Sequence, residues 1–331
     1  MYRADDQIVL KNGALRVVLL PCSGGRIESL QGAGFEFLLQ PSNPSDKPNE
    51  GVISGIRFQD GACSGIDECL PTVAMSSVGV SGLEAPDHGD FWSIPWTVLE
   101  PVSTCSVTIT ADGTSRPLRF TKRLEVHQTF LSIDYKVQNL SGQQIEYLYA
   151  CHPLLAIDPG DRIVLPTEVT TLRVESSRHE RLGAQGDIVS WPTPLGTEEA
   201  IDLSVALPPN ADTADMLYAG PLASGRCGLF RSVLGRGIMV HFDPSQLPYL
   251  GLWLCYGGWP DGSEHRQLAV ALEPAIAARG SLEDAVRDGV ASVLAPHDTH
   301  SWHIEFHIAG LDGILSEEAF VRLIEAGSSP I

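Results

Sequence analysis

The chain has 331 residues, of which 43% are hydrophobic and 19% are charged, a composition typical of a globular protein with a large core. Its 22 Lys and Arg against 41 Asp and Glu give a net charge of −19, which repels phosphate backbones and anionic lipid surfaces. We therefore expect no nucleic-acid partner and no membrane partner, and neutral small molecules remain as candidate ligands.

The N-terminal sequence MYRADDQIVLKNG carries charges where a signal peptide needs an apolar stretch. No apolar run is as long as a membrane-spanning helix requires. The seven cysteines are scattered and include no C-x-x-C pair, which suits a reducing compartment. These features predict a cytoplasmic protein.

The dominant pattern along the chain is the alternation of apolar and polar residues, clearest in LSIDYKV at 131–137. Such alternation predicts an antiparallel strand with one face in the core and the other in water. Taken in chain order, comparable strands are expected at 7–10, 14–20, 104–110, 117–126, 145–150, 226–233, 237–242, 249–255, 267–273 and 301–308. Many strands with few helices indicate an all-β protein, built as a large sandwich or barrel.

Two helices are expected near the C-terminus. Ser281 is placed to cap a helix over 282–290, and Ser316 begins a second helix with an acidic first turn and apolar residues on one face. Both are expected to be peripheral. The sequence contains no internal repeat and no linker long enough to separate two domains, so we expect a single domain over residues 1–331.

Two candidate motifs are excluded, one by the spacing of its glycines and the other by the direction of its side chains. Gly24 and Gly25 follow a strand, but the G-x-G-x-x-G spacing of a dinucleotide-binding turn is absent. Cys151 and His152 are neighbours on a strand, so their side chains point to opposite faces and cannot form a thiol–imidazole pair. We therefore expect neither a nucleotide cofactor nor a nucleophilic cysteine.

His303, Glu305 and His307 alternate with apolar residues and share one face of the last strand. On a straight strand His303 and His307 would lie about 13 Å apart, which is too far for both to bind one ion. We therefore expect this face to be solvated and to carry no metal.

Three stretches place polar groups at turns or strand ends: Asp87-His88-Gly89-Asp90, Cys151-His152-Pro153-Leu154-Leu155, and the sequence LAVALEP, in which Glu273 ends an apolar strand. A carboxylate at the edge of a core loses hydration, which raises its proton affinity and suits it to act as a general base. Considered alone, each of the three has an ordinary structural interpretation. Their co-occurrence favours a shared site.

Together these stretches resemble the aldose 1-epimerase (galactose mutarotase-like) superfamily, in which a His-Gly, a His-Pro and a Leu-Glu-Pro-like motif follow one another in this order. The sequences GGRIESL, LSIDYKVQNLSG, YACHPLLAID, LPYLGLWLCYGGW and HSWHIEFHIAG are also similar, so the resemblance spans nearly the whole chain. It implies an antiparallel β-supersandwich with a few short peripheral helices and a small-molecule carbohydrate as ligand. It also implies a reaction at the anomeric carbon that needs no cofactor and no metal.

The resemblance implies roles for individual residues. Glu273 resembles the base that removes the proton of the C1 hydroxyl, and His152 resembles the acid that protonates the ring oxygen. His88 looks like a second histidine that binds the sugar on the ring-oxygen side. Asp87 or Asp90 could orient His88 or contact the sugar.

Further substrate-binding residues follow from the same resemblance. Arg57, in SGIRFQDG, occupies the place of the family's sugar-binding arginine. Trp92 and Trp259, with Trp96 and Trp253, could stack on a sugar face, although each could equally belong to the core.

The chain departs from the family pattern in three places. Leu154, Leu155, Ala156 and Ile157 follow the His-Pro pair where many relatives have aromatic residues and an asparagine, and Asp90 stands where galactose mutarotases often have glycine. The family's mid-chain sugar-binding aspartate has no clear match. These departures leave the identity of the sugar open.

The leading hypothesis is an enzyme that interconverts the anomers of a free aldose. A hexose-6-phosphate 1-epimerase relative would need clustered cations for the phosphate, and Arg26, Arg57, Arg123 and Arg162 are not clustered in the sequence. A non-catalytic carbohydrate-binding or regulatory protein with the same fold is the third alternative, against which the presence of both histidines and the glutamate argues. The oligomeric state is left open.

Overall fold

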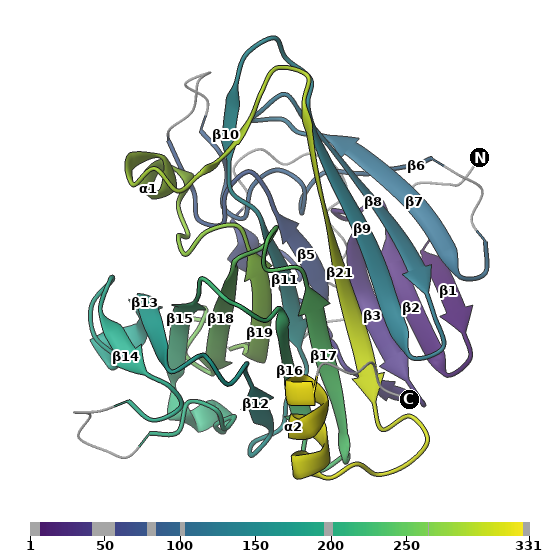
Figure 1. The fold of residues 1–331 in the computed structure, drawn as a ribbon, viewed down its shortest axis with the longest axis vertical. Helices are drawn as coiled ribbons and strands as arrows, with labels where there is room; N and C mark the ends of the chain where they lie inside the picture. Colours follow the sequence, from purple (N-terminus) through teal and green to yellow (C-terminus); the bar gives the residue numbers. More distant parts are fainter. Residues whose placement is uncertain are drawn as a thin grey trace.

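Two large antiparallel sheets supply most of the regular structure (Figure 1). The structure, a computed structural model, describes residues 7–41, 57–77, 84–99, 103–194, 201–263 and 265–326. In Figure 1 the strands β21, β9, β8 and β7 lie in front of β3, β2 and β1, so the two sheets form two layers. The all-β antiparallel sandwich expected from the sequence is confirmed.

The larger sheet has 11 strands in the order β1-β2-β3-β5-β11-β19-β18-β15-β13-β14, with β4 paired to β3. Every neighbouring pair in it is antiparallel. In sheet order the strands are β1 Ile8–Asn12, β2 Leu15–Leu20, β3 Arg26–Gly32, β5 Ile66–Cys69, β11 Ala150–Leu155, β19 Leu268–Ala275, β18 Tyr249–Tyr256, β15 Thr213–Ala219, β13 Thr171–Ser177 and β14 Ile188–Ser190, with β4 at Phe35–Glu36.

The smaller sheet has 8 strands in the order β12-β16-β17-β21-β9-β8-β7-β6. They are β12 Arg162–Val164, β16 Arg226–Arg231, β17 Arg236–Phe242, β21 Thr299–Ala309, β9 Phe130–Asn139, β8 Leu118–Val126, β7 Ser106–Asp112 and β6 Thr97–Val98. Two further short strands, β10 Ile145–Tyr147 and β20 Ser292–Leu294, pair with each other. The expected strand at 145–150 is therefore divided: its first half is β10, and its last residue begins β11.

The core fills the space between the two large sheets and takes residues from both. Strand β9 shows why the sequence folds in this way. Ile133, Tyr135 and Val137 are buried in this core, whereas Asp134 and Lys136 on the other face are exposed. The period-two alternation thus reports directly which face of the strand meets the opposite sheet.

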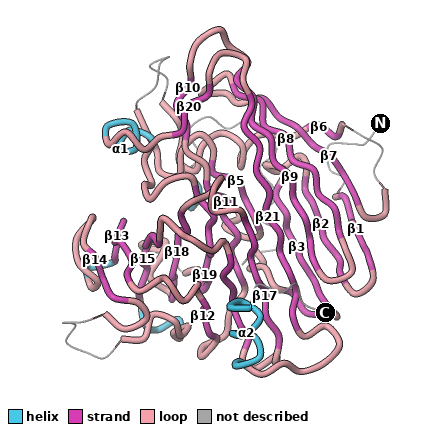
Figure 2. The backbone as a smooth tube through the Cα atoms, in the orientation of Figure 1, coloured by secondary structure: helices cyan, strands magenta, loops and turns pink. Residues whose placement is uncertain are grey.

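Helix is confined to short segments at the periphery (Figure 2). Helix α1, Leu282–Arg287, begins as expected after Ser281, whose hydroxyl accepts a hydrogen bond from the backbone N–H of Glu283 at 3.1 Å. It ends at Arg287, three residues before the expected end. Short 3-10 turns lie at Phe58–Asp60 (η1), Arg178–Glu180 (η2) and Pro209–Ala211 (η3).

Helix α2, Glu317–Ala326, follows Ser316, whose hydroxyl accepts from the N–H of Ala319. Its buried residues Phe320 and Ile324 pack on the outer face of the eight-stranded sheet. None of the described helices is long and apolar enough to cross a membrane.

The outer face of β21 is not uniformly solvated, which corrects the sequence-based expectation. His303 has 40% of its side chain exposed, but His307 has only 2% exposed. The ring of His307 is covered by Phe130 on β9, with ring centroids 4.6 Å apart, and by His241 on β17, at 4.3 Å. Residues of neighbouring strands cause this burial, so a single-strand pattern could not reveal it.

Candidate active site

His152 and Glu273 lie on adjacent strands in the middle of the 11-stranded sheet. The β11–β19 ladder pairs Ala150 with Ala275 and Leu154 with Ala271, and it is interrupted between these pairs. The interruption coincides with Pro153 and Pro274, which have no N–H to donate. The same register places His152 opposite Glu273, with Nε2 of His152 3.7 Å from Oε1 of Glu273.

This pair belongs to a row of residues that crosses the sheet. On β5, Asp67 is paired with His152, and on β18, Gly251 is paired with Glu273. Directly opposed residues of antiparallel strands point to the same face. That face is the outer one, because the intervening residue Leu272 contacts the core between the sheets.

The side chain of Glu273 is 2% exposed, and burial raises the pKa of its carboxyl group to about 8. Its Oε2 atom has no hydrogen-bond partner among the described residues. An unpartnered buried carboxyl group with a pKa near neutrality can exchange a proton with a ligand at physiological pH.

The side chain of His152 is 7% exposed, and burial, with a smaller effect of the neighbouring His88, lowers the pKa of its imidazole well below the usual range. Its Nδ1 atom also has no partner among the described residues. Phe58 and His88 contact the ring edge-on, with centroid distances of 5.2 Å and 5.1 Å. Without a ligand, the single proton of this His–Glu pair therefore resides mainly on Glu273, because that tautomer leaves no charge buried.

His88 is held by its backbone, by a carboxylate and by an aromatic ring. His88 and Gly89 both have positive φ, at 60° and 74°, and a Cβ on residue 89 would lie 2.0 Å from the carbonyl oxygen of Leu70, so only glycine fits there. The His88 ring stacks on Phe58 with centroids 3.9 Å apart. Its Nδ1 is 2.9 Å from Oδ1 of Asp87.

Asp87 is the residue that orients His88. Its second oxygen accepts the backbone N–H of Phe58 at 3.0 Å. Burial favours the protonated form of Asp87, but the hydrogen bonds from His88 and Phe58 outweigh it, so the pKa of Asp87 is lowered. When neutral His88 donates Nδ1–H to Asp87, its Nε2 is left as an acceptor for a ligand hydroxyl.

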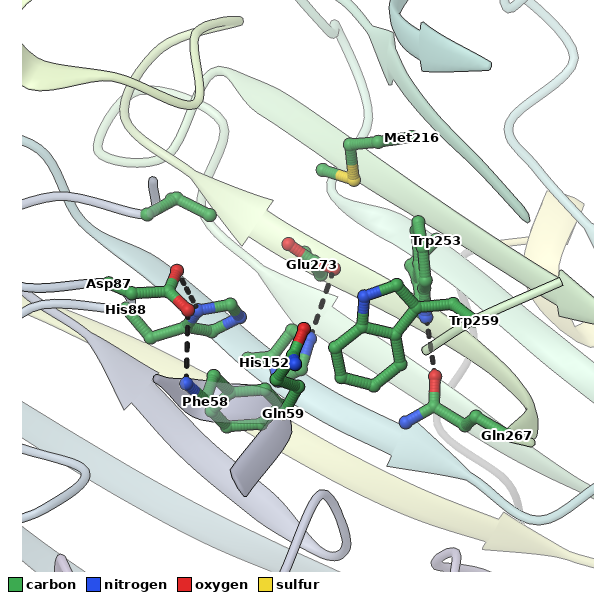
Figure 3. Close-up of a pocket in the computed structure, with 11 residues that line it drawn as sticks. Phe58, Gln59, Asp87, His88, His152, Met216, Trp253, Trp259, Gln267 and Glu273 are labelled. Carbon is green, nitrogen blue, oxygen red and sulfur yellow. Dashed lines mark hydrogen bonds and ion pairs between the residues drawn. The ribbon is translucent and has the colours of Figure 1, made fainter. Parts of the chain in front are cut away.

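The three residues that the sequence singled out for acid–base chemistry, His88, His152 and Glu273, line one cavity of about 210 Å³ (Figure 3). Trp253 and Trp259 form its opposite wall, with their rings nearly perpendicular and their centroids 6.1 Å apart. The remaining lining residues are Phe58, Gln59, Val73, Asp87, Met216 and Gln267. Aromatic surface beside a few convergent polar groups is the usual composition of a small-molecule site.

The ring of Trp253 is fixed by Gln267, whose Oε1 accepts its indole N–H at 2.6 Å. No lysine or arginine is found among the described residues that line the cavity. The described lining is therefore apolar and aromatic, apart from one His–Glu pair, one His–Asp pair and two glutamine amides.

Three of the expected substrate-binding residues do not line this cavity. Arg57 has 65% of its side chain exposed and is ion-paired with Asp60 at 3.0 Å. Trp92 is 3% exposed, donates its indole N–H to the carbonyl of Asp87 at 2.8 Å, and packs behind Phe58. Of the substrate-binding residues expected from the sequence, Asp87 and Trp259 line the cavity.

Asp90 is the third expected substrate-binding residue that does not line the cavity, and its hydrogen bonds explain its position. It is 1% exposed and accepts four hydrogen bonds from the backbone N–H groups and hydroxyls of Thr114 and Ser115, at 2.9 to 3.0 Å. These bonds use both carboxylate oxygens to anchor a turn. We therefore assign Asp90 a structural role, and Asp87 alone contacts His88.

Several residues of the site were missed from the sequence. Met216 and Gly251 lie on β15 and β18, and they reach the site only because these strands are stacked beside β19 in the sheet. Asp67 lies beside His152, is 2% exposed, and burial raises its pKa to about 7. Phe58 and Gln59, which line the cavity, directly follow Arg57 in the sequence SGIRFQDG.

Comparisons with known proteins give the class of the fold. A scan against protein-family models found no match, and a search of curated proteins found none either. Solved structures do match over nearly the whole chain, and most of the similar structures are described as aldose 1-epimerase or galactose mutarotase-like proteins. The chain has the galactose mutarotase-like fold, as the sequence resemblance implied.

Three of the similar solved structures illustrate the likeness. The Slr1438 protein of Synechocystis sp. PCC 6803 has a TM-score of 0.68 and 15% identity, covering 93% of this chain and 98% of that one. A galactose mutarotase-like protein from Lactobacillus casei has a TM-score of 0.64 and 14% identity, covering 92% and 100%. A galactose mutarotase related enzyme from Lactobacillus acidophilus has a TM-score of 0.63 and 15% identity, covering 94% and 100%.

Proposed function

We propose that this protein is an aldose 1-epimerase-like isomerase that interconverts the anomers of a free, unphosphorylated aldose. The observation that carries the proposal is the His152–Glu273 pair, with Nε2 and Oε1 3.7 Å apart in a cavity walled by two tryptophans. Anomer interconversion needs one base and one acid on opposite sides of the C1–O5 bond, and the pair supplies both.

The reaction begins from the tautomer in which Glu273 is a carboxylate and His152 an imidazolium. Glu273 takes the proton of the C1 hydroxyl while His152 gives its proton to the ring oxygen, and the C1–O5 bond breaks to leave an open aldehyde. The pair has then passed into its neutral tautomer, protonated Glu273 and neutral His152. Rotation about C1–C2 presents the other face of the aldehyde, and both proton transfers reverse as the ring closes.

His88 and the aromatic walls hold the sugar during this exchange. Nε2 of His88 accepts a sugar hydroxyl on the ring-oxygen side, because its Nδ1 faces Asp87. Trp253 or Trp259 stacks on the apolar face of the ring. Met216 and Gln59 also line the cavity and would select among sugars by shape.

The described lining favours a free sugar over a hexose 6-phosphate. A phosphate dianion is normally bound by arginine or lysine, and neither occurs among the described residues around the cavity. The exposed Arg57 is already paired with Asp60. We therefore propose a neutral substrate, consistent with the net charge of −19.

A screen by NMR saturation exchange over free and phosphorylated aldoses tests the proposal. We expect enzyme-dependent exchange between the anomers of at least one free aldose, lost in Glu273→Gln and in His152→Gln. Binding of a sugar without any exchange would instead assign a non-catalytic carbohydrate-binding role. Exchange of hexose 6-phosphates alone would overturn the neutral substrate.

A further inference from the structure

The outer face of the eight-stranded sheet carries a second group of titratable side chains, on the opposite layer from the cavity. Strands β17 and β21 pair so that His241 lies directly opposite Glu305, and His307 follows Glu305 two residues further along the same face. The alternate residues Val240 and Phe306 point into the core. The three polar side chains therefore project from the face that does not meet the other sheet.

These side chains bring their ligand atoms into one small volume. One nitrogen of His241, one of His307 and one oxygen of Glu305 all lie within 4.8 Å of one another. Nε2 of His307 is 2.7 Å from Oε2 of Glu305. Ligands of a tetrahedral zinc ion lie about 3.4 Å apart at the usual bond lengths, so modest side-chain rotations would bring all three onto one ion.

The neighbouring residues orient this group. His303 lies between the carboxylates of Asp134 and Glu305, with its ring nitrogens 2.8 Å and 3.2 Å from them, and so holds the second oxygen of Glu305. Nε2 of His241 is buried and has no hydrogen-bond partner among the described residues. A buried nitrogen with no partner is costly in a folded protein, and a bound cation would satisfy it.

The charges around this group lie on two sides of it. Arg226 on β16 is paired with His241 on the side away from Glu305, and its charge opposes a cation. The carboxyl groups of Glu305 and Asp134 lie on the other side of His241, on β21 and β9, and His303 links them.

We propose that His241, Glu305 and His307 form a binding site for a divalent transition-metal ion such as zinc, with the remaining coordination position open to water. Two imidazoles and one carboxylate suit zinc, cobalt or nickel, whereas magnesium and calcium prefer oxygen ligands alone. The spacing of His303 and His307 along one strand prevents them from binding one ion together. The ligand that completes the site comes from β17, and His303 supports Glu305 from outside it.

The site is independent of the proposed sugar chemistry. It joins β17 to β21 in the sheet that does not carry the cavity. An ion that binds only the folded chain raises its stability by mass action. The expected consequence of metal binding is thus a higher melting temperature and no change in anomer exchange.

Titration of the metal-free, full-length protein with Zn²⁺ by calorimetry, with the bound metal counted after gel filtration, tests this site. We expect one zinc per chain and no comparable binding of Mg²⁺ or Ca²⁺. His241→Ala, Glu305→Gln and His307→Ala should each weaken binding by about 100-fold or more, and His303→Ala by about 10- to 100-fold. The cavity variant His152→Gln and the exposed-surface variant His297→Ala are the matched controls and should bind as the wild type does.

Cobalt provides a second readout that does not depend on variant stability. Co²⁺ bound to the wild type should give the visible absorption of a low-coordinate nitrogen and oxygen site, and Zn²⁺ should displace it. The proposal is overturned if the wild type binds no stoichiometric zinc. It is equally overturned if binding survives Glu305→Gln and His307→Ala together, or is lost in His152→Gln.

Discussion

Gly251 lies directly opposite Glu273 across β18 and β19, and a Cβ atom on residue 251 would come within 3.2 Å of both Cβ and Oε2 of Glu273. The absence of a side chain at this position leaves room for the buried carboxyl group and for Cε of Met216, which would lie 2.8 Å from the added Cβ. Glycine is otherwise unfavourable inside a strand. Its place in a central strand is therefore explained by the group it faces.

Gly251→Ala should lower kcat by about 3- to 10-fold, because the added Cβ would displace Glu273 by a few tenths of an ångström and a displacement of about 1 Å costs about 100-fold. The backbone at residue 251 needs no positive φ, so the fold should persist and the melting temperature should change little. Kinetics of anomer exchange and thermal melting measure the two effects. Gly142→Ala is the matched control, because its added Cβ meets nothing within 4 Å; equal activities of the two variants would contradict the prediction.

Glu273→Gln should reduce turnover by about 10²- to 10⁴-fold, the usual contribution of a general base or acid, and His152→Gln should cost a similar factor. The glutamine keeps the size of the side chain, so the fold should remain. Progress curves on the best sugar, with melting temperatures alongside, separate this from a structural role. Full activity of the Glu273→Gln variant would rule out the proposed mechanism.

Glu273→Gln should differ from the wild type in its free energy of unfolding, by an amount that grows with pH. The pKa of Glu273 is about 8 in the folded protein and 4.5 in its reference state, so the folded chain holds this proton more tightly. As pH rises from about 4.5 to about 8, the wild type loses the stability linked to that proton, and the glutamine variant does not. Melting temperatures of both proteins across this range should diverge in favour of Glu273→Gln; parallel curves would show that this carboxyl group is not perturbed.

The pH dependence of kcat/KM should be flat up to about pH 8 and should fall above it. The reactive form of the pair carries one proton, shared between His152 and Glu273, and this proton is lost as pH rises through the pKa of about 8. At the acid end, the decline should begin only below the lowered pKa of His152. A rate that increases through pH 8 would mean that ionised Glu273 acts without a protonated His152.

His88→Asn should raise KM by about tenfold, as loss of one hydrogen bond to the sugar predicts, and should also lower kcat. The ring of His88 stacks on Phe58 and is oriented by Asp87, and asparagine cannot reproduce this arrangement. Steady-state kinetics separate the two constants. His297→Asn, at an exposed position, should leave both unchanged, and an unchanged KM in His88→Asn would remove His88 from sugar binding.

Chelator treatment should leave anomer exchange unchanged, because the proposed reaction requires only an acid and a base. Assays before and after exhaustive dialysis against a chelator measure this. The same sample should show the lower melting temperature expected from loss of metal at the His241, Glu305 and His307 site. Loss of turnover that a divalent ion restores would contradict the proposed mechanism.

The fold was predictable from the sequence where a strand shows clear alternation, as in β9, or a long apolar run, as in β19, whereas the strands β3, β13 and β15 were not expected. Strand β9 and the cap at Ser281 followed directly from local pattern. Strand β5 was missed because it has only four residues, IDEC, and its adjacent charged residues Asp67 and Glu68 are both buried, so it shows neither alternation nor an apolar run. Its Glu68 is fully buried and hydrogen-bonded to Lys122, a partner that only the opposite sheet provides.

The candidate site was predictable only in part. His88, His152 and Glu273 stand in recognisable motifs, and the structure brings them together. The choice between Asp87 and Asp90 was not predictable, because both flank the same turn and only the fold shows which of them meets Thr114. The cross-strand neighbours of the site depend on sheet order, which local sequence does not encode.

The row formed by Asp67, His152, Glu273 and Gly251 takes one residue from each of four strands, and β5, β11 and the consecutive pair β18–β19 lie far apart in the chain. Contacts between distant segments form slowly, because the entropy of long loops is lost before any contact compensates for it. Catalytic competence should therefore return late when the denatured protein is diluted into buffer, after most of the far-ultraviolet circular dichroism has recovered. The recovery of turnover would thus report when the native contacts between the N-terminal and C-terminal halves of the chain have formed.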